Sequence, residues 1–111
     1  MLHSEPNVSA VGRWWGQVPT GEARRTEERE VDVVGVDGEG RPVAIGMCKW
    51  TSSAVDFDEL NLLERLAPHV GDSGAARRYL FSRSGFSDRL TDFAARQQNL
   101  VLVTPGDIYR A

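Results

Sequence analysis

The stretch REVDVVGVDGEGRPVAIGMCKW, residues 29–50, carries the main fold signal of the chain. Valines recur in residues 31–36 and apolar residues dominate residues 42–50, as is typical of two strands. The residues between them, DGEG, include glycines, which readily adopt the positive φ of a tight turn. The stretch therefore predicts a β-hairpin that carries Asp32 in its first strand and Lys49 near the end of its second.

The register of this hairpin decides whether the two charges meet. Side chains alternate between the faces of a strand, so Asp32 is expected on the face of Val34, and Lys49 on the face of Met47. A two-residue or a four-residue loop places Asp32, Met47 and Lys49 on one face, whereas a three-residue loop separates them. We expect the shared face, with the Asp32 carboxylate within about 8 Å of the Lys49 ammonium.

After the hairpin, residues 56–70 show apolar residues at helical spacing. Asp56 and Glu59 resemble an N-terminal capping pair, and Pro68 is expected to end the helix nearby. The residues expected to be buried in the core are Phe57, Leu60, Leu63, Phe93, Leu100 and Leu102.

The remainder of the chain alternates between strand and helix patterns. Residues 77–82 and 99–104 have the apolar content of strands, and Ser87 is placed to cap a helix between them. A strand–helix–strand order implies a parallel, right-handed crossover. The sequence therefore predicts an α/β fold: a mixed sheet, made of an antiparallel hairpin followed by a βαβαβ unit, flanked by helices.

The length of 111 residues predicts one domain. Residues 1–12 are polar and unpatterned, so we interpret them as a flexible lead-in to a domain over residues 13–111. GRWWG at 12–16 is followed by the charged residues 17–30, which are expected to form an exposed loop before the first strand. The N-terminus lacks the apolar segment of a signal peptide and no run is long enough to span a bilayer, so we expect a cytoplasmic protein without membrane contacts.

The composition excludes several classes of site. Cys48 is the sole cysteine, which excludes an internal disulfide and a cysteine-based zinc site. The net charge of −3 argues against a broadly basic nucleic-acid binder. Lys49 is the sole lysine among thirteen basic residues, and arginine does not replace lysine where a compact point charge is needed.

Four motifs in order, GRWWG, EVDVVGVD, GMCKW and YLFSRSGF, resemble a known family. They are similar to the domain of unknown function at the C-terminus of certain archaeal and bacterial P-loop ATPases. An aspartate in the first strand of a hairpin and acid-x-Lys in the second also resembles the PD-(D/E)XK, restriction-endonuclease-like superfamily. The resemblance covers residues 11 to about 104 and implies a restriction-endonuclease-like fold.

The resemblance implies a specific chemistry. In that superfamily two carboxylates hold Mg²⁺, which carries the scissile phosphate, and a lysine stabilises the charge that develops on it. Asp32 matches the metal-binding aspartate and Lys49 the lysine, but Met47 stands at the second acid position. A thioether is a poor ligand for a hard cation. Glu30, two residues before Asp32, is a partial substitute for the missing acid.

We therefore expect a non-catalytic accessory module with a degenerate nuclease-like site and no cofactor. It is expected to work with, or as part of, a P-loop ATPase in docking protein or DNA. One alternative is an active Mg²⁺-dependent DNA endonuclease that uses Asp32, Glu30 and Lys49. A second alternative is a stand-alone interaction domain with an exposed tryptophan patch.

Three local interpretations remain open. Asp32 and Lys49 could form a plain cross-strand ion pair on a half-exposed face. Trp14 and Trp15 could stack on nucleic-acid bases or, as we favour, cover the sheet edge or pack in the core. The basic cluster best placed to contact nucleic acid consists of Arg77, Arg78 and Arg83.

Overall fold

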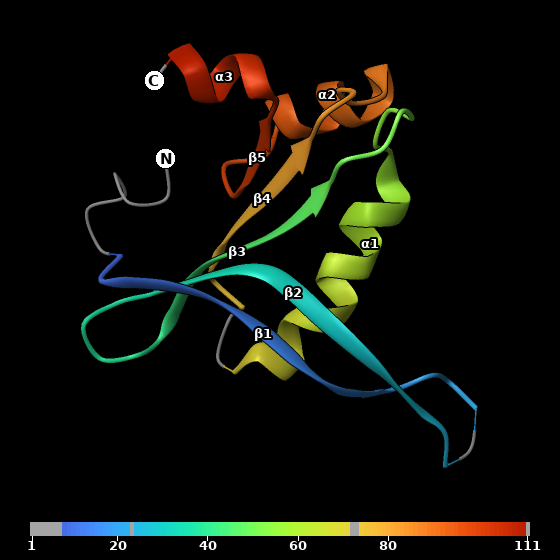
Figure 1. The fold of residues 1–111 in the computed structure, drawn as a ribbon, viewed down its shortest axis with the longest axis vertical. Coiled ribbons are helices and arrows are strands. Elements are labelled where there is room, and N and C mark those ends of the chain that lie inside the picture. Colours follow the sequence, from blue (N-terminus) through green and yellow to red (C-terminus); the bar gives the residue numbers. More distant parts are fainter. Residues whose placement is uncertain (1–7, 23, 72–73, 111) are drawn as a thin grey trace.

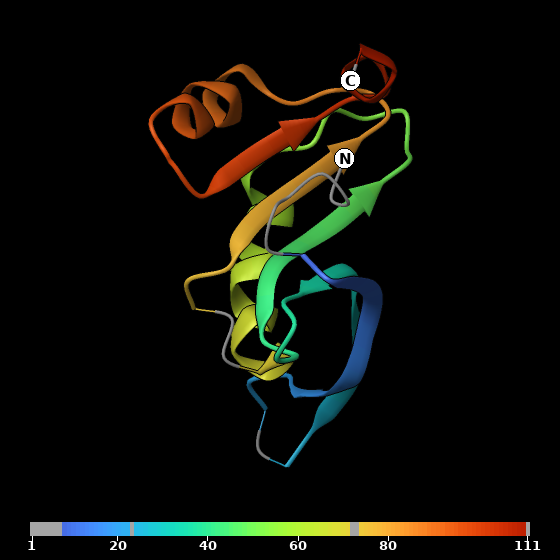
Figure 2. The same ribbon diagram turned by 90° about the vertical axis from the view of Figure 1, so that its left-hand side faces the viewer.

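The computed structural model describes residues 8–22, 24–71 and 74–110, and within them the chain forms one five-stranded sheet with helices packed against it (Figures 1 and 2). The strands lie in the order of the sequence, β1-β2-β3-β4-β5. Their bounds are β1 Ala10–Pro19, β2 Thr26–Val36, β3 Pro42–Lys49, β4 Arg77–Ser82 and β5 Leu100–Val103. The helices are α1 Phe57–Leu66, the 3-10 helix η2 Ala67–Val70, α2 Asp88–Ala95 and α3 Pro105–Arg110.

The sheet is mixed, as the sequence predicts. β1, β2 and β3 pair antiparallel, whereas β3, β4 and β5 pair parallel. The helix α1 connects β3 to β4 and α2 connects β4 to β5, which confirms the antiparallel hairpin followed by alternating helices and strands. Within the described residues no helix is long and apolar enough to cross a membrane.

The strand β1 is absent from the sequence prediction. Residues 17–30 were expected to form an exposed loop, but residues 17–19 belong to β1 and residues 26–30 to β2. The strand also begins at Ala10, before the expected domain start at residue 13, while residues 1–7 lie outside the described part of the chain. Both strands are largely exposed in this part of the hairpin and carry charged side chains, so the sequence lacks the alternation of apolar and polar residues that marks a strand.

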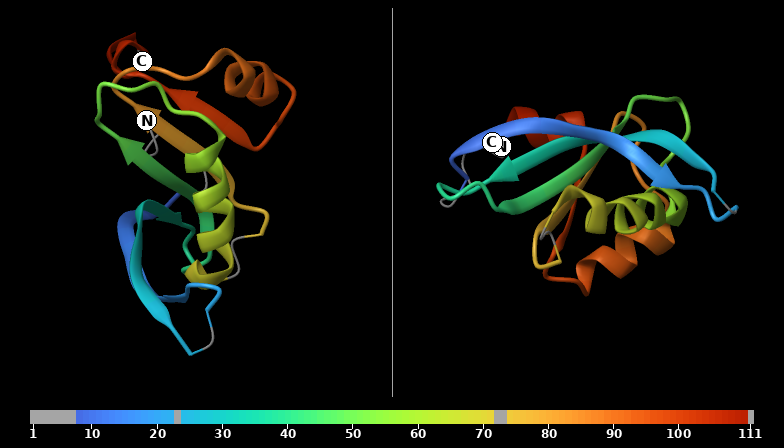
Figure 3. Two further views of the ribbon diagram at one scale, coloured as in Figure 1. Left: turned by 90° about the vertical axis from the view of Figure 1, so that its right-hand side faces the viewer. Right: turned by 90° about the horizontal axis from the view of Figure 1, so that it is seen from below.

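We call the face of the sheet that carries α1 and α2 the helical face, and both helices lie on that side in Figure 3. Leucines 60, 63 and 66 of α1 and Leu90 of α2 pack there against strand residues that include Val34, Ile45, Met47 and Leu80. The opposite face buries a smaller cluster: Ala44, Tyr79, Phe81 and Val103, with Val33, Cys48 and Val101 packed against it.

Most of the expected core is confirmed. Leu60, Leu63 and Leu100 are buried, and Phe57 and Leu102 are partly buried against the same cluster. The prediction is wrong for Phe93, which is 37% exposed. The ring of Phe93 packs edge-on against Phe57, with 5.3 Å between the ring centroids, so it contacts an aromatic neighbour that is itself only partly buried.

The turn of the β2–β3 hairpin has a loop length that we expected to separate Asp32 from Lys49. The amide of Asp37 donates to the carbonyl of Arg41 (3.0 Å), which leaves three residues between them, and Gly40 takes a φ of 81°. The register then shifts between Gly35 and Val36, so that Val34 lies opposite Ile45. A bulge thus compensates for the loop and restores the pairing that a two- or four-residue loop would give.

The N-termini of α1 and α2 are joined through one carboxylate. Asp56 caps α1 by accepting from the Phe57 amide (2.8 Å), and it also accepts from the Ser87 hydroxyl (2.9 Å). Ser87 in turn caps α2, and the Arg89 guanidinium pairs with Asp56 at 2.8 Å. These hydrogen bonds, that of Arg89 first, lower the pKa of Asp56 from 3.8 to about 2.

This lowered pKa predicts a pH dependence of stability. Because the folded pKa of Asp56 lies below the unfolded value, its charge stabilises the domain above about pH 4, and that contribution is lost as the pH falls towards 2. Asp56→Asn should therefore lower the urea midpoint at pH 5 and differ little from wild type near pH 2. Asp58→Asn, which removes an exposed carboxylate from the same turn, is the matched control. Equal destabilisation by Asp56→Asn at both pH values would contradict the prediction.

Candidate functional site

Asp32 lies in a bulge of β2. Val31 and Val34 both pack in the core of the helical face although they are three positions apart, which a regular strand does not allow. The β1–β2 register shifts between Gly12 and Trp14, opposite Asp32 and Val33. The sequence predicts that Asp32 shares a face with Val34 and Met47. The bulge interrupts the alternation of side chains, so Asp32 does not lie on the helical face with them.

The Asp32 carboxylate bonds to the main chain of the neighbouring strand. Its Oδ2 accepts from the amide of Cys48 at 2.8 Å, beyond the last β2–β3 pair, Val33 with Gly46. The carboxylate thus takes the place of a backbone carbonyl where the two strands diverge. Cys48 packs against the cluster on the opposite face, and burial, followed by the charge of Asp32, raises the pKa of its thiol.

Met47 occupies the position at which the superfamily pattern has its second acid. It is 9% exposed and belongs to the core of the helical face. Its parallel neighbour in the sheet is Leu80, which is 1% exposed. The side chain therefore serves as a core hydrophobe in surroundings where a carboxylate would lose its hydration.

Lys49 forms an ion pair with a helix rather than with Asp32. Its Nζ lies 3.2 Å from Oε1 of Glu59 in the first turn of α1. The Glu59 side chain is 13% exposed and that of Lys49 is 45% exposed. No ion pair joins Lys49 to Asp32 within the described part of the chain, so the interpretation of a cross-strand Asp32–Lys49 pair is wrong.

Sequence reasoning missed this role of Glu59. Its spacing from Asp56 suggested a capping pair, and Asp56 does cap the helix. The Glu59 side chain, however, reaches across to the end of β3. The only sequence signal for the pairing is a sole lysine with a glutamate ten residues later. This spacing does not predict a contact, because the contact depends on how the connection between β3 and α1 folds.

Glu30 contacts the edge strand instead of the position of Met47. It lies opposite Trp15 of β1, and its carboxylate is 3.9 Å from the Arg13 guanidinium. Its side chain is 49% exposed. Glu30 therefore forms a surface ion pair and does not replace the missing acid beside Lys49.

The donor set does not fit a Mg²⁺ site. A thioether replaces one acid and Glu30 is paired with Arg13, which leaves Asp32 as the one carboxylate of the pattern at the site. Among the residues that the structure describes, no three histidine, cysteine or acidic side chains are grouped as metal ligands. Glu5, the single carboxylate of residues 1–12, lies outside them.

The three arginines of the expected basic cluster are not brought together. Arg78 is 11% exposed in its side chain, pairs with Glu64 at 2.8 Å and donates to the carbonyls of Gly74 and Ala76. Arg77 is the first residue of β4, whereas Arg83 follows its last residue, so their main-chain positions are about 20 Å apart. This arrangement does not form a continuous phosphate-binding patch.

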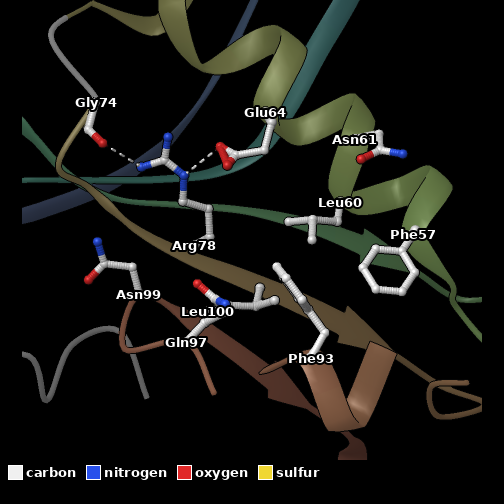
Figure 4. A pocket seen from close by; sticks show the side chains of 10 residues that line it. All are labelled: Phe57, Leu60, Asn61, Glu64, Gly74, Arg78, Phe93, Gln97, Asn99 and Leu100. Carbon is white, nitrogen blue, oxygen red and sulfur yellow. Dashed lines mark hydrogen bonds and ion pairs between the residues drawn. The ribbon is translucent and has the colours of Figure 1, made fainter. Parts of the chain in front are cut away.

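A groove of about 460 Å³ lies beside Arg78, between α1 and the starts of β4 and β5 (Figure 4). The Arg78–Glu64 ion pair lies at one end of it, and the rings of Phe57 and Phe93 at the other. Ligands of parallel sheets bind beyond the carboxyl ends of the strands, where Lys49 ends β3. The groove is therefore separate from the candidate site.

The tryptophans have divided roles. Trp14 is partly buried against the core of the helical face, as we favoured for one of the pair. Trp15 is 61% exposed and Trp50, just after β3, is 53% exposed. Two large rings are therefore left at the surface.

Comparison with known proteins gives one positive result. No curated protein and no solved structure matches the chain. Residues 2–60, slightly more than half of the 111, match a family of archaeal and bacterial proteins, and this segment contains β1 to β3 with the first three motifs. The chain belongs to the family described as archaeal and bacterial proteins of unknown function.

Proposed function

We propose that this domain is a non-catalytic accessory module which retains a nuclease-like arrangement of strands and works with, or as part of, a P-loop ATPase. The observation that carries the first part is the burial of Met47 in the core of the helical face. A side chain that stabilises the fold from the acid position leaves no room there for a metal-binding carboxylate.

The contacts of the two matched residues support the same proposal. Lys49 would have to leave Glu59 before its ammonium met a phosphate, and the Asp32 carboxylate is directed to the main chain of β3 by its hydrogen bond with the Cys48 amide. Each residue instead holds two parts of the fold together: β3 to α1, and β2 to β3. Their positions in the hairpin support an ancestral site whose side chains now serve stability.

The association with a P-loop ATPase rests on the four motifs that resemble the C-terminal domains of such proteins. Protein docking is favoured over DNA docking, because the net charge is −3 and Arg78 is held by Glu64 and by main-chain carbonyls. The exposed rings of Trp15 and Trp50 are side chains of the kind enriched at protein interfaces.

A cleavage assay tests the absence of catalysis. The wild-type chain, Asp32→Ala and Lys49→Ala are incubated with plasmid and with single-stranded oligonucleotide in Mg²⁺ or Mn²⁺. We expect no cutting by any of them, because loss of metal positioning and of electrostatic stabilisation removes many orders of magnitude in rate. Metal-dependent cutting by wild type that disappears in both variants would establish the alternative, an active endonuclease.

A further inference from the structure

The GRWWG motif lies in β1, the first strand of the sheet (Figure 1). One edge of β1 pairs with β2 from Ala10 to Pro19. No strand of the described residues pairs with its other edge, since β1 ends the strand order. The amide and carbonyl groups of a ten-residue strand therefore alternate along an edge that can accept another strand.

This edge has few of the features that prevent strands from pairing. Native edge strands are commonly protected by several charged side chains, by proline or by shortness. β1 has one charged residue, Arg13, and its proline, Pro19, is at the very end. It also exposes Trp15 by 61% and Val11 by 38% on the same side of the strand.

We propose that β1 pairs antiparallel with β1 of a second copy of this chain, about a two-fold axis at Trp14, so that two sheets join into one. This inference is independent of the proposed function. Residues directly opposite each other across an antiparallel pair share a face, and a two-fold axis preserves the face of every residue. The axis must therefore lie at a residue that is directly opposite the same residue of the other copy, and not between two successive residues.

The axis at Trp14 gives the best pairing of β1 with itself. It pairs residues 10–18 of both copies and leaves out Pro19, which has no amide to donate. An axis at Trp15 pairs residues 11–19 and brings Pro19 into the ladder. An axis at Arg13 shortens the ladder and sets two guanidinium groups against each other.

In this register the exposed side chains complement each other. Arg13 of each copy lies opposite Trp15 of the other copy, so a guanidinium can stack on each indole. Glu30 is the cross-strand neighbour of Trp15 and lies 3.9 Å from the Arg13 of its own copy. Each Trp15 is then flanked by a cation from the second copy and an anion from its own copy.

The glycines of the motif fit on the helical face. The Trp14 ring covers Gly16, where an added Cβ would lie 2.8 Å from the ring. An added Cβ on Gly12, in contrast, meets nothing within 4 Å. With the axis at Trp14, Gly12 of one copy lies opposite Gly16 of the other. The two Trp14 residues lie directly opposite each other, and each ring, because it covers Gly16 of its own copy, faces Gly12 of the other copy, which has no side chain. The partner strand can therefore approach.

Sedimentation equilibrium of the full chain, from about 10 µM to about 1 mM, tests the association. We expect a reversible dimer, weakened at least about tenfold by Trp15→Glu, because Trp15 contributes the stacked ring. Trp50→Glu changes a ring of similar exposure that is not part of β1 and should leave the dimer intact. A wild-type monomer at the highest concentration, or equal effects of the two variants when both remain folded by circular dichroism, would overturn the proposal.

Cross-linking tests the register. In a Cys48→Ser background, the double variant Val11→Cys, Gln17→Cys places a cysteine opposite a cysteine at two points when the axis is at Trp14. We expect disulfide-linked dimers from this variant and few from Val11→Cys alone. An axis at Trp15 pairs Val11 with Pro19 and Gln17 with Arg13. Equal cross-linking of the single and double variants would therefore overturn the proposed register.

Discussion

Met47→Glu should destabilise the domain by about 3–5 kcal/mol at pH 7, and it should not restore a metal site. In the sequence, this substitution restores the acid-x-Lys pattern of the metal-binding superfamily. In the structure, however, Met47 is 9% exposed among core residues such as Ile45 and Leu80. A carboxylate placed there loses its hydration, and burial raises its pKa well above the usual range for glutamate.

The pH dependence distinguishes a buried charge from a simple loss of packing. Because the folded pKa of the introduced carboxyl lies above its unfolded value of about 4.3, its cost should shrink as the pH falls towards that value. Met47→Gln has nearly the same shape without the charge, so the difference between the two variants in urea unfolding at pH 5–8 isolates this effect. Met47→Leu should cost less than about 1.5 kcal/mol, because it conserves volume and apolarity.

One combination of results would contradict this account. If Met47→Glu retained wild-type stability and bound Mg²⁺ by isothermal titration calorimetry, the position would be open to solvent and to metal. The nuclease-like site would then lack only its acid. Destabilisation without Mg²⁺ binding would support the assignment of position 47 to the hydrophobic core.

Leu63→Ala is the second large effect, with an expected loss of about 2–5 kcal/mol in the free energy of unfolding. Leu63 is fully buried, in the middle of the α1 face that packs on the sheet. Removing its branched end leaves a cavity between helix and strands, and close-packed neighbours fill such a cavity only in part.

Leu62→Ala is the matched control for this prediction. It removes the same atoms from the adjacent, partly buried residue of the same helix. Urea unfolding monitored by circular dichroism should show a clearly smaller loss for Leu62→Ala. Equal losses in the two variants would mean that the leucine at 62 is as deeply packed as the one at 63.

Several elements could be predicted because their signals are local. The helical spacing of Leu60, Leu63 and Leu66 marks the buried face of α1, and Asp56 and Ser87 cap the two helices as expected. The valines of β2 and the apolar run of β5 mark strands by the same kind of pattern. Such signals depend on neighbours within a few positions, so they can be recognised in the sequence without the tertiary structure.

The strand β1 shows where local signals end. Its one face carries Gly12, Trp14, Gly16 and Val18, two of which have no side chain, so the alternation of apolar residues is weak. The strand exists because β2 pairs with it and because Val18 is buried in the core, at 1% exposure. Both causes lie in tertiary contacts.

The types and order of the later strands and helices follow from periodicity, caps and turn residues in the sequence. The contacts of Asp32 and Lys49, in contrast, depend on the tertiary structure. A bulge opposite Gly12–Trp14 turned Asp32 to the Cys48 amide, and the packing of α1 brought Glu59 to Lys49. A one-residue register shift changes the face of a side chain without changing the strand pattern, so no local signal predicts it.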